Sequence, residues 1–558
     1  MTKHVFVTGG VVSGLGKGVT ASALGRLLKN CGLKVTAQKL DPYINIDSGR
    51  INPIEHGEVF VTEDGAETDL DIGHYERFID EDLGKFSTTS AGKIYWDVLR
   101  KERDGEYLGQ TVQVIPHITD EIKNFIYSAA RTSDADVVIT EIGGTTGDIE
   151  GLPFIEAVRQ IHAETGDGNS IFIHVTLVPY LYASHEYKSK PTQHSVKQLQ
   201  SLGIFPDIIV LRSEGHVGDD IKRKIALFCN VKQDSVIENV NIPLLYEAPL
   251  MFEKQKFCEI VLDHLSIEAR PPDMSEWEAM LARVAGRDKG ITIGLVGKYT
   301  KLHDAYYSAL QALNHAGYEI GAKVEIKWID SETVTRENAA GLLDDVDGIL
   351  VPGGFGERGI PGMIEACRYA RENDVPYFGI SLGMQVAIIE FARNVMGLAA
   401  ADSTEFDALT PDPVIHKAPG MGGGSPDGNG TESGAANGAM RLGAYPCVIR
   451  EGSLMRAAYG KEEIAERHRH RYEANNDYRE RLEGAGMSIT GESPDGRFIE
   501  AVENPALGFF IGVQYHPEFK SRPNRAHPLF REFTRAAMER KYKTAGSQGG
   551  GSQGGSHE

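Results

Sequence analysis

The pattern of apolar and polar positions along the first half of the chain alternates between strand-like and helix-like stretches. Short runs of apolar, largely β-branched residues recur, and amphipathic stretches with helical spacing separate them. A strand buried on both faces appears in the sequence as a continuous apolar run, and the helices that connect parallel strands carry one apolar face. The runs lie at residues 5–7, 136–140, 171–175 and 207–211. This pattern predicts βαβ units built around a parallel sheet.

The same alternation returns in the second half after a polar interruption. The segment 266–273, SIEARPPD, contains two consecutive prolines and is typical of a domain exit. Beyond it, apolar runs begin at 291 and recur at 348–351, 377–380 and 509–514. A chain of 558 residues is also longer than one ordinary core supports. We therefore predict an α/β protein with two domains, each a mainly parallel sheet flanked by helices. The predicted ranges are 1–266 for the first domain, 267–290 for the linker and 291–543 for the second domain.

Two segments of biased composition interrupt this pattern. Residues 418–438 are rich in glycine, and we expect a flexible loop within the second domain. Residues 544–558 are rich in glycine, serine and glutamine, and we expect a disordered tail.

Composition and charge narrow the class of partner. The chain is 41% hydrophobic and 25% charged, and no apolar run approaches the ~18 residues that a membrane helix needs. The first residues enter a strand directly and lack the pattern of a secretory signal. A net charge of −21 disfavours nucleic acid as a partner, because binding to phosphates requires a basic face. Five scattered cysteines show no metal-ligand spacing. We expect a cytoplasmic protein that binds neither membrane nor nucleic acid.

A glycine-rich turn joins the first strand to the first helix. Residues 8–18, TGGVVSGLGKG, place backbone N–H groups and Lys17 where the phosphates of a nucleotide bind. The turn departs from G-x-x-x-x-G-K-[ST] at Val11 and at Gly18, which has no hydroxyl to offer a metal ion. Carboxylates must then hold Mg²⁺, and Asp71 and Glu141 lie at suitable places in the pattern. The sequence predicts a site for a nucleoside triphosphate and Mg²⁺.

A second polar segment offers charge for another nucleotide. Residues 188–195, KSKPTQHS, combine two ammonium groups with hydroxyls and an amide, and Lys224 adds a further charge. Such a segment suits a second triphosphate, although a polar loop of this kind is more often only a loop.

The segment 379–383 reads Gly-Ile-Ser-Leu-Gly and has the form of a nucleophile elbow between a strand and a helix. It fits either a serine hydrolase or an amidotransferase in which Ser381 stands where cysteine is usual. The glycines at 353–356 offer N–H groups to an oxyanion, and His516 with Glu518 supplies a base and its orienting acid. The order nucleophile, His, acid differs from that of α/β-hydrolases, which disfavours the serine-hydrolase interpretation.

Taken together, these segments resemble the CTP synthase family from the first strand to about residue 540. The second half is similar to a class I glutamine amidotransferase domain, whose elbow in this family carries cysteine. The motifs that carry the resemblance lie at residues 9–13, 16–18, 39–43, 56–61, 141–144, 190–195 and 467–472.

The resemblance implies a ligase that converts UTP to CTP. ATP would phosphorylate the uracil O4, and ammonia released from glutamine would displace the phosphate. The resemblance also implies Mg²⁺ as cofactor, GTP as allosteric activator, CTP as product inhibitor and a homotetramer.

The resemblance further assigns residues to each ligand. It assigns ATP to Gly14, Leu15, Gly16, Lys17, Gly18, Val19 and Asp71, and Mg²⁺ to Asp71 and Glu141. It assigns UTP or CTP to Ser13, Asp148, Ile149, Glu150, Lys188, Ser189, Lys190, Pro191, Thr192, Gln193 and Lys224. It assigns glutamine to Gly354, Leu382, Gly383, Met384, Gln385, Glu405 and Arg471. The catalytic residues would be Ser381, His516 and Glu518.

Ser381 is the main departure from the family. A serine hydroxyl is far less acidic than a thiol, so it needs a base aligned to take its proton during attack. We therefore expect impaired use of glutamine with ammonia-dependent activity retained. The alternatives are a synthetase of the cobyrinate type and a non-catalytic or filament-forming regulatory copy.

Overall fold

A computed structural model describes residues 2–12, 14–46, 57–417 and 440–548 of the chain. Ser13, the predicted loop at 418–438 and residues 549–558 of the predicted tail lie outside the described residues. The chain divides into two compact units. Unit 1 comprises residues 1–51 and 67–281, and unit 2 comprises residues 52–66 and 282–558.

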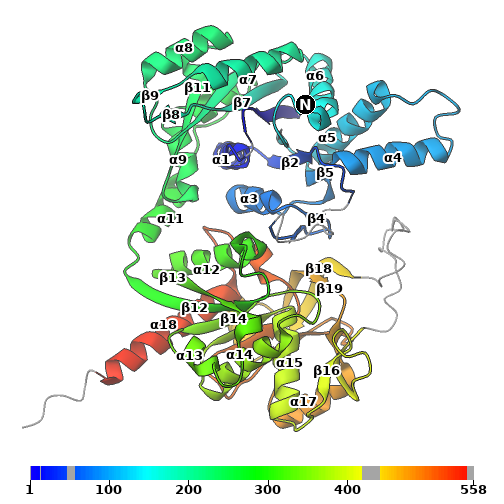
Figure 1. Ribbon diagram of the computed structural model, residues 1–558, viewed down its shortest axis with the longest axis vertical. Coiled ribbons are helices and arrows are strands. Elements are labelled where there is room, and N and C mark those ends of the chain that lie inside the picture. Colours follow the sequence, from blue (N-terminus) through cyan, green and yellow to red (C-terminus); the bar gives the residue numbers. More distant parts are fainter. Residues whose placement is uncertain (1, 13, 47–56, 418–439, 549–558) are drawn as a thin grey trace, which may run out of the picture. The chain divides into compact units, whose positions relative to one another are not determined.

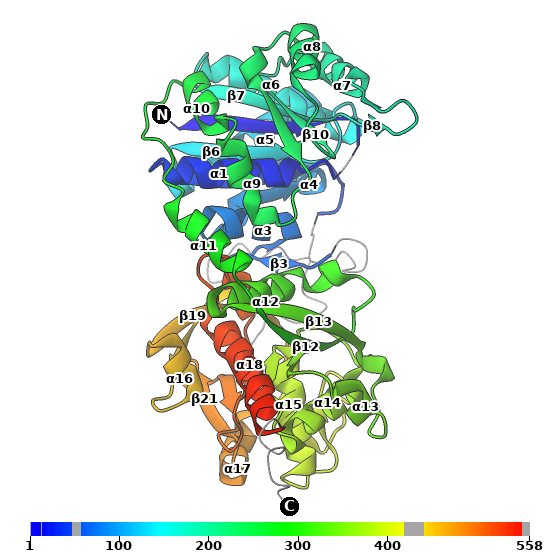
Figure 2. The ribbon, with the colours of Figure 1, turned by 90° about the vertical axis from the view of Figure 1, so that its left-hand side faces the viewer.

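Unit 1 is built on a seven-stranded parallel sheet with helices on both faces (Figures 1 and 2). Its strands, in spatial order, are β11 (Val236–Val240), β10 (Ile208–Ser213), β7 (Ser170–Leu177), β1 (Lys3–Gly9), β6 (Val137–Ile142), β2 (Val35–Asp41) and β5 (Thr88–Ser90). Short strands β4 (Glu67–Thr68), β8 (Tyr180–Leu181) and β9 (Glu186–Tyr187) lie outside this sheet. All four apolar runs predicted for this half fall on strands of the sheet.

The helices of unit 1 lie on the two faces of its sheet, and the side chains of each strand point alternately to one face and the other. Phe6 of β1 packs in one apolar cluster with residues of α4, α5 and α6, whereas Ile139 of β6 faces the opposite side, where α1 lies against it. The helices are α1 (Lys17–Asn30), α3 (Leu70–Ile79), α4 (Ala91–Arg103), α5 (Thr119–Ser133), α6 (Leu152–Thr165), α7 (Lys190–Ser201), α8 (Asp219–Cys229), α9 (Ala248–Glu253) and α10 (Phe257–His264).

Unit 2 is built on a nine-stranded mixed sheet. Five strands are parallel, in the order β13 (Ala322–Asp330), β12 (Lys289–Gly297), β14 (Gly348–Val351), β15 (Tyr377–Ile380) and β23 (Phe510–Val513). Antiparallel strands continue the sheet as β22 (Ile499–Glu503), β21 (Ser488–Glu492), β18 (Arg441–Ile449) and β19 (Glu463–His470). A small sheet contains β16 (Ala401–Ser403), β17 (Asp412–His416) and β20 (Glu473–Ala474), and β3 is Phe60–Val61. The predicted α/β architecture with two sheets is confirmed.

Two apolar clusters cover the two faces of the unit 2 sheet. In β15, Tyr377 belongs to the cluster that includes α14 and α15, and Phe378 to the cluster that includes α12 and α18. Figure 2 shows α18 crossing one face of this sheet. The helices are α12 (Tyr307–Ile320), α13 (Ala339–Leu343), α14 (Ile360–Glu372), α15 (Leu382–Asn394), α16 (Leu454–Tyr459), α17 (Arg479–Ala485) and α18 (Pro528–Gln548).

Two details bear on the predicted boundaries. The stretch predicted as a linker contains α11 (Ser275–Ala285), whose Trp277 is buried and donates its indole N–H to the carbonyl of Tyr246 at 2.7 Å. Helix α18 ends at Gln548, so it overlaps the first residues of the predicted tail. Among the described residues, no helix is both long and apolar enough to cross a membrane.

Candidate functional site

The phosphate turn of unit 1 lies between β1 and α1 and is built from backbone conformations that favour glycine. Gly14 and Gly16 have φ of +73° and +84°, and Gly16 is the N-cap of α1. Val11 has φ of +86°, a value that is strained for a β-branched residue. The position where the phosphate-loop pattern expects glycine therefore keeps a glycine-like backbone even though valine occupies it.

Lys17 lies under the turn rather than in solvent. Its ammonium donates to the carbonyl of Gly144 at 2.6 Å, and burial lowers its pKa. Its side chain fills the space beside Gly9, where a Cβ would lie 2.7 Å from the Lys17 Cδ. Gly9 is required at this point because any side chain would displace the lysine.

Two acidic side chains meet beside the first turn of α1. A Cβ built on Gly18 would lie 3.4 Å from Asp71 Oδ1 and 3.4 Å from Glu141 Oε2, so both carboxylates face the same small space. Lys39 pairs with Asp71 and also with Asp69 at 3.2 Å. The residues predicted to bind Mg²⁺ therefore surround the space that a side chain at position 18 would occupy.

The charges in this cluster act strongly on one another. Burial and the nearby charge of Asp71 raise the pKa of Glu141 to about 7, and the Tyr75 hydroxyl donates to Glu141. Burial disfavours ionised Asp71, but the Lys39 ammonium outweighs this effect and lowers the pKa of Asp71. Carboxylate oxygens are the ligands that Mg²⁺ takes in nucleotide sites, and a dication would favour the ionised form of Glu141. The residues present therefore fit a Mg²⁺ ion.

His174 of β7 connects the phosphate turn with α7. Thr8 Oγ1 lies 2.8 Å from His174 Nδ1, and Ser195 Oγ lies 2.8 Å from His174 Nε2. Burial lowers the pKa of His174 to about 3, so the ring is neutral. Sequence analysis missed this role because the strand pattern around His174 indicates only burial.

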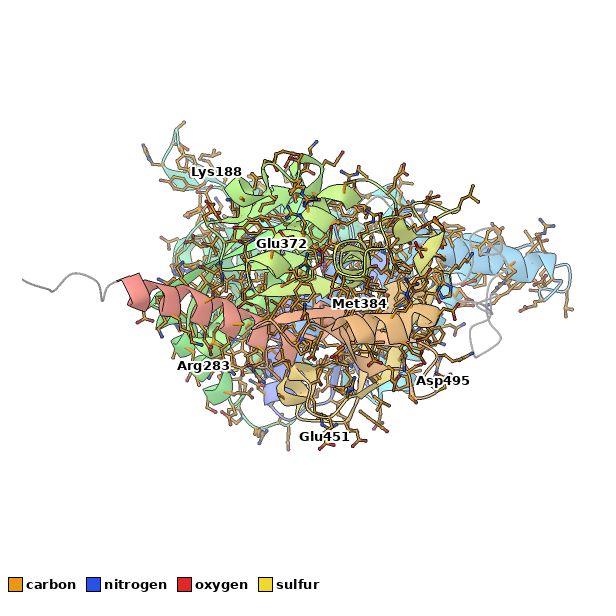
Figure 3. The ribbon with its side chains drawn as sticks, turned by 90° about the horizontal axis from the view of Figure 1, so that it is seen from below. Lys188, Arg283, Glu372, Met384, Glu451 and Asp495 are labelled. Carbon is orange, nitrogen blue, oxygen red and sulfur yellow. The ribbon has the colours of Figure 1, made fainter. Side chains whose placement is uncertain are left out.

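The segment predicted for the second nucleotide begins at the surface and continues into α7. Lys188 bonds to Glu186 and is labelled in Figure 3 on a loop of unit 1. The pKa of Glu186 is lowered first by its hydrogen bond from Lys188 and, to a smaller degree, by the charge of Lys224. The structure therefore brings Lys188 and Lys224 to one surface. Thr192, by contrast, is buried, and its hydroxyl oxygen lies 3.0 Å from the hydroxyl oxygen of Thr176.

Residues 148–150, which the resemblance assigns to UTP or CTP, are exposed. Asp148 accepts a hydrogen bond from the Thr145 N–H at 2.8 Å, and Ile149 is 81% exposed. Within the described parts of the chain, no hydrogen bond or ion pair joins residues 148–150 to residues 188–193. The structure does not bring these two groups into direct contact.

The elbow of unit 2 has the sharp geometry that its sequence predicts. Ser381 has φ of +52° and ψ of −101°, and its N–H donates to the carbonyl of Val513 at 2.7 Å. A Cβ on Gly383 would lie 2.1 Å from the carbonyl oxygen of Val351, and one on Gly379 would meet Gly383 at 2.6 Å. Both flanking glycines are therefore required for the turn between β15 and α15.

The predicted base and acid lie together beside this elbow. His516 Nδ1 lies 2.7 Å from Glu518 Oε1, and both side chains are buried. The His516 ring lies against Gly353, where a Cβ would be 2.7 Å from the ring Cε1. In the described structure His516 Nε2 is buried without a hydrogen-bond partner, so Ser381 Oγ does not bond to it.

Lys298 holds the glycine loop that follows β14, a role that sequence analysis did not foresee. Its ammonium donates to the carbonyls of Phe355 and Gly356, and its stem lies against Gly354. Burial lowers the pKa of Lys298 to about 8. Because these carbonyls accept hydrogen bonds from Lys298, the orientation of the loop beside the elbow is fixed.

The residues predicted to bind glutamine are arranged around the same loop. Glu405 accepts a hydrogen bond from the Gly356 N–H at 2.8 Å, and Arg471 lies 5.5 Å from the centre of the Phe355 ring. Gln385 donates to the Tyr472 carbonyl at 2.9 Å. Leu382 and Met384 are buried in α15, and Met384 packs on Gly512.

The segment 57–66 belongs to unit 2, although it lies within the range predicted for the first domain. Glu58 accepts hydrogen bonds from the N–H and the hydroxyl of Ser308 at the start of α12. Arg467 donates to Glu63 at 2.9 Å and to the Val61 carbonyl at 3.0 Å. We call residues 57–66 the strap.

A small cavity of about 80 Å³ lies between the strap and the glycine loop that follows β14. Its lining includes Glu58 and Val59 of the strap, His516 and Glu518, and the glycines at 353–354. The strap and the predicted base, His516, therefore line one cavity.

Comparison with known proteins agrees with this two-part arrangement. Residues 3–267 match the family described as CTP synthase N-terminus, and residues 301–536 match glutamine amidotransferase class-I. The chain is 57% identical to the CTP synthase of Clostridium acetobutylicum, over 97% of this chain and 100% of that protein. The chain belongs to the CTP synthase family. It is also 58% identical to the CTP synthase of Staphylococcus aureus strain JH9, over 97% of this chain and 99% of that protein.

A solved structure titled as the glutaminase domain of Trypanosoma brucei CTPS with bound acivicin is 38% identical to this chain. It matches 45% of this chain and 94% of its own chain, with a TM-score of 0.40. The resemblance to the CTP synthase family that the motifs indicated is confirmed. The assignments of individual residues to ligands stay predictions.

Proposed function

We propose that the protein converts UTP to CTP, with ATP phosphorylating the uracil O4 and ammonia displacing the phosphate at C4. The observation that carries this proposal is the cluster of Lys17, Asp71 and Glu141 at the phosphate turn, in a chain of the CTP synthase family. The family supplies the reaction, and the cluster provides the groups that phosphoryl transfer needs.

In unit 1, each residue of the cluster has a distinct task. The turn's N–H groups and the N-terminus of α1 bind phosphate oxygens, and Lys17 carries positive charge to the outer phosphates. Asp71 and Glu141 would hold Mg²⁺, which neutralises charge on the phosphates when bound. Lys188 and Lys224 would bind the triphosphate of UTP at the surface they share. GTP activation, inhibition by CTP and a homotetramer follow from the family resemblance and belong to the same proposal.

In unit 2, we propose that the elbow binds glutamine but hydrolyses it poorly. His516, oriented by Glu518, is the base that would take the proton of Ser381 during attack on the glutamine amide. His516 Nε2 makes no hydrogen bond to the serine hydroxyl in the described structure, which supports this proposal. A thiol ionises readily without such alignment, whereas a serine hydroxyl does not.

Any ammonia released while His516 acts as the base would form next to this histidine, which lines the cavity beside the strap. Its volume of about 80 Å³ is ample for a molecule of ammonia. The backbone N–H groups of the glycine loop and of Leu382 would stabilise the oxyanion formed at the elbow.

Parallel assays with glutamine and with ammonium chloride, at equal UTP, ATP and Mg²⁺, test both parts of the proposal. We expect CTP from ammonia, and a glutamine-dependent rate lower by roughly a hundredfold or more. Ser381→Cys should raise the glutamine-dependent rate and leave the ammonia-dependent rate unchanged. Equal rates from the two nitrogen sources in the unaltered chain would show that Ser381 is a competent nucleophile.

Two further outcomes distinguish the alternatives. If neither nitrogen source gives CTP, the chain is a non-catalytic or regulatory copy. Mass spectrometry of the protein with glutamine separates slow chemistry from none, since a glutamyl ester on Ser381 indicates slow turnover and unmodified Ser381 with intact glutamine indicates binding alone.

A further inference from the structure

Two cysteines of unit 1 that no part of the proposed reaction uses lie in direct contact. Cys31 is the C-cap of α1, and Cys258 is the second residue of α10. Their sulfur atoms are 3.3 Å apart, although the residues are 227 positions apart in the chain. The sulfurs of a disulfide lie about 2.05 Å apart, so an approach of little more than one ångström would bring these two to bonding distance.

The surroundings of this pair favour redox chemistry over metal binding. Among the residues that the structure describes, no group of three His, Cys, Asp or Glu side chains is placed to hold a metal ion. Cys229 of the same unit lies in a separate apolar cluster, so it serves as an isolated thiol for comparison.

We propose that Cys31 and Cys258 form a redox modification site, which closes reversibly to a disulfide when a hydroperoxide reaches Cys31. Cys31 is 4% exposed, whereas Cys258 is fully buried, so a small oxidant meets Cys31 first. Cys31 is followed by the exposed Gly32, next to which the Arg270 guanidinium lies.

The two thiols have different roles in the reaction. The hydrogen bond between the two sulfurs lowers the pKa of Cys31, and the charge of Arg270 acts in the same direction. The same contact and burial raise the pKa of Cys258. Cys31 is therefore the nucleophile and Cys258 the resolving thiol.

The chemistry balances with hydrogen peroxide as the oxidant. The Cys31 thiolate attacks one peroxide oxygen, the O–O bond breaks, and the product is a sulfenic acid with hydroxide, which takes up a proton to form water. The Cys258 sulfur then attacks the Cys31 sulfur, the S–O bond breaks, and a second water leaves with the Cys258 proton. Two thiols lose two electrons and two protons, and one peroxide becomes two waters.

The bond would connect the far end of the phosphate-binding helix to α10. Helix α1 begins at Lys17 and ends beside Cys31, so a disulfide there holds the helix opposite its phosphate end. Because it closes a loop of 227 positions, the bond restricts the unfolded chain strongly and should raise the midpoint of thermal unfolding.

The test is peroxide oxidation of the full-length, reduced protein, followed by intact mass and peptide mapping. We expect loss of two hydrogen atoms, one linked pair of peptides containing Cys31 and Cys258, and full reversal by dithiothreitol. The midpoint of thermal unfolding should rise by several degrees on oxidation. Cys229→Ser should behave as the unaltered protein does.

Cys31→Ser and Cys258→Ser should each abolish the linked peptide and the shift in midpoint. Both replacements are nearly isosteric, and the thermal midpoint of each reduced variant shows whether it is folded. The proposal is overturned if the unaltered protein keeps both thiols free, if Cys31 is oxidised only to sulfinic or sulfonic acid, or if the linked peptide contains a different cysteine.

Discussion

The phosphate turn of unit 1 and the nucleophile elbow of unit 2 each lack a side-chain group that their motifs usually carry. In the turn, Gly18 has no hydroxyl, yet Asp71 and Glu141 both face the space beside it. In the elbow, Ser381 has no sulfur, and His516 Nε2 has no partner within the described structure. Neighbouring carboxylates stand beside the first position, whereas beside the second the described structure holds a buried nitrogen without a hydrogen bond.

This difference follows from how each group works. Mg²⁺ has six octahedral ligand positions and keeps water in several of them, so carboxylates on α3 and β6 can take the place of a hydroxyl on α1. A nucleophile must be one particular atom at one particular place, in line with its base. Substitution is therefore more easily tolerated at a charge-binding site than at a site of covalent chemistry.

The largest expected effect comes from removing Lys17. Lys17→Met should lower the rate of CTP formation from ammonia and from glutamine alike, by roughly a hundred- to a thousandfold, because it removes the buried charge that we propose binds the phosphates. Initial rates measured with each nitrogen source check this. Lys29→Met is the matched control, since Lys29 is at the other end of α1 and pairs with Glu81 at 2.7 Å. A loss confined to glutamine would contradict the assignment of Lys17 to the phosphates.

A smaller and more selective effect is expected at Glu518. In a Ser381→Cys background, Glu518→Gln should lower the glutamine-dependent rate by at least about tenfold, because His516 loses the acid that fixes its tautomer. The ammonia-dependent rate should not change. Glu451→Gln, at an exposed position of the same unit, is the control. Equal loss with both nitrogen sources would place Glu518 outside the glutaminase chemistry.

The smallest effect concerns stability rather than rate. His174 has a folded pKa of about 3 and an unfolded pKa of about 6.5, so protons bind the unfolded state more readily. Its contribution is complete above about pH 6.5 and is lost as the pH falls toward 3. Between pH 7.5 and 5.5 this one group should lower the free energy of unfolding by about 1.4 kcal/mol.

Denaturant unfolding at the two pH values checks this prediction. His174→Gln cannot titrate, so its loss of stability over that interval should be smaller by about 1.4 kcal/mol. His185→Gln, at an exposed position of the same unit, should keep the slope of the unaltered protein. An unchanged slope in His174→Gln would show that His174 takes up no proton over this interval when the protein unfolds.

The sequence predicted the strands well because buried parallel strands leave continuous apolar runs. The runs at 348–351 and 377–380 coincide with β14 and β15. It also identified the turn and the elbow, since both motifs are local. Lys298 and His174 contact residues that are far away in the chain. The sequence around each residue contains no motif that would mark it as part of a site. Helix α18 continues to Gln548, so its last residues overlap the range predicted as a tail.

The strap has a consequence for dividing this protein into parts. Cutting the chain at residue 290 would yield an amidotransferase fragment without residues 57–66. In that fragment Arg467, which is fully buried, would lose its bonds to Glu63 and to the Val61 carbonyl, and Ser308 would lose its bonds to Glu58. Two fragments divided at the linker would therefore not correspond to the two folding units. The strap peptide added in trans should therefore stabilise the isolated fragment.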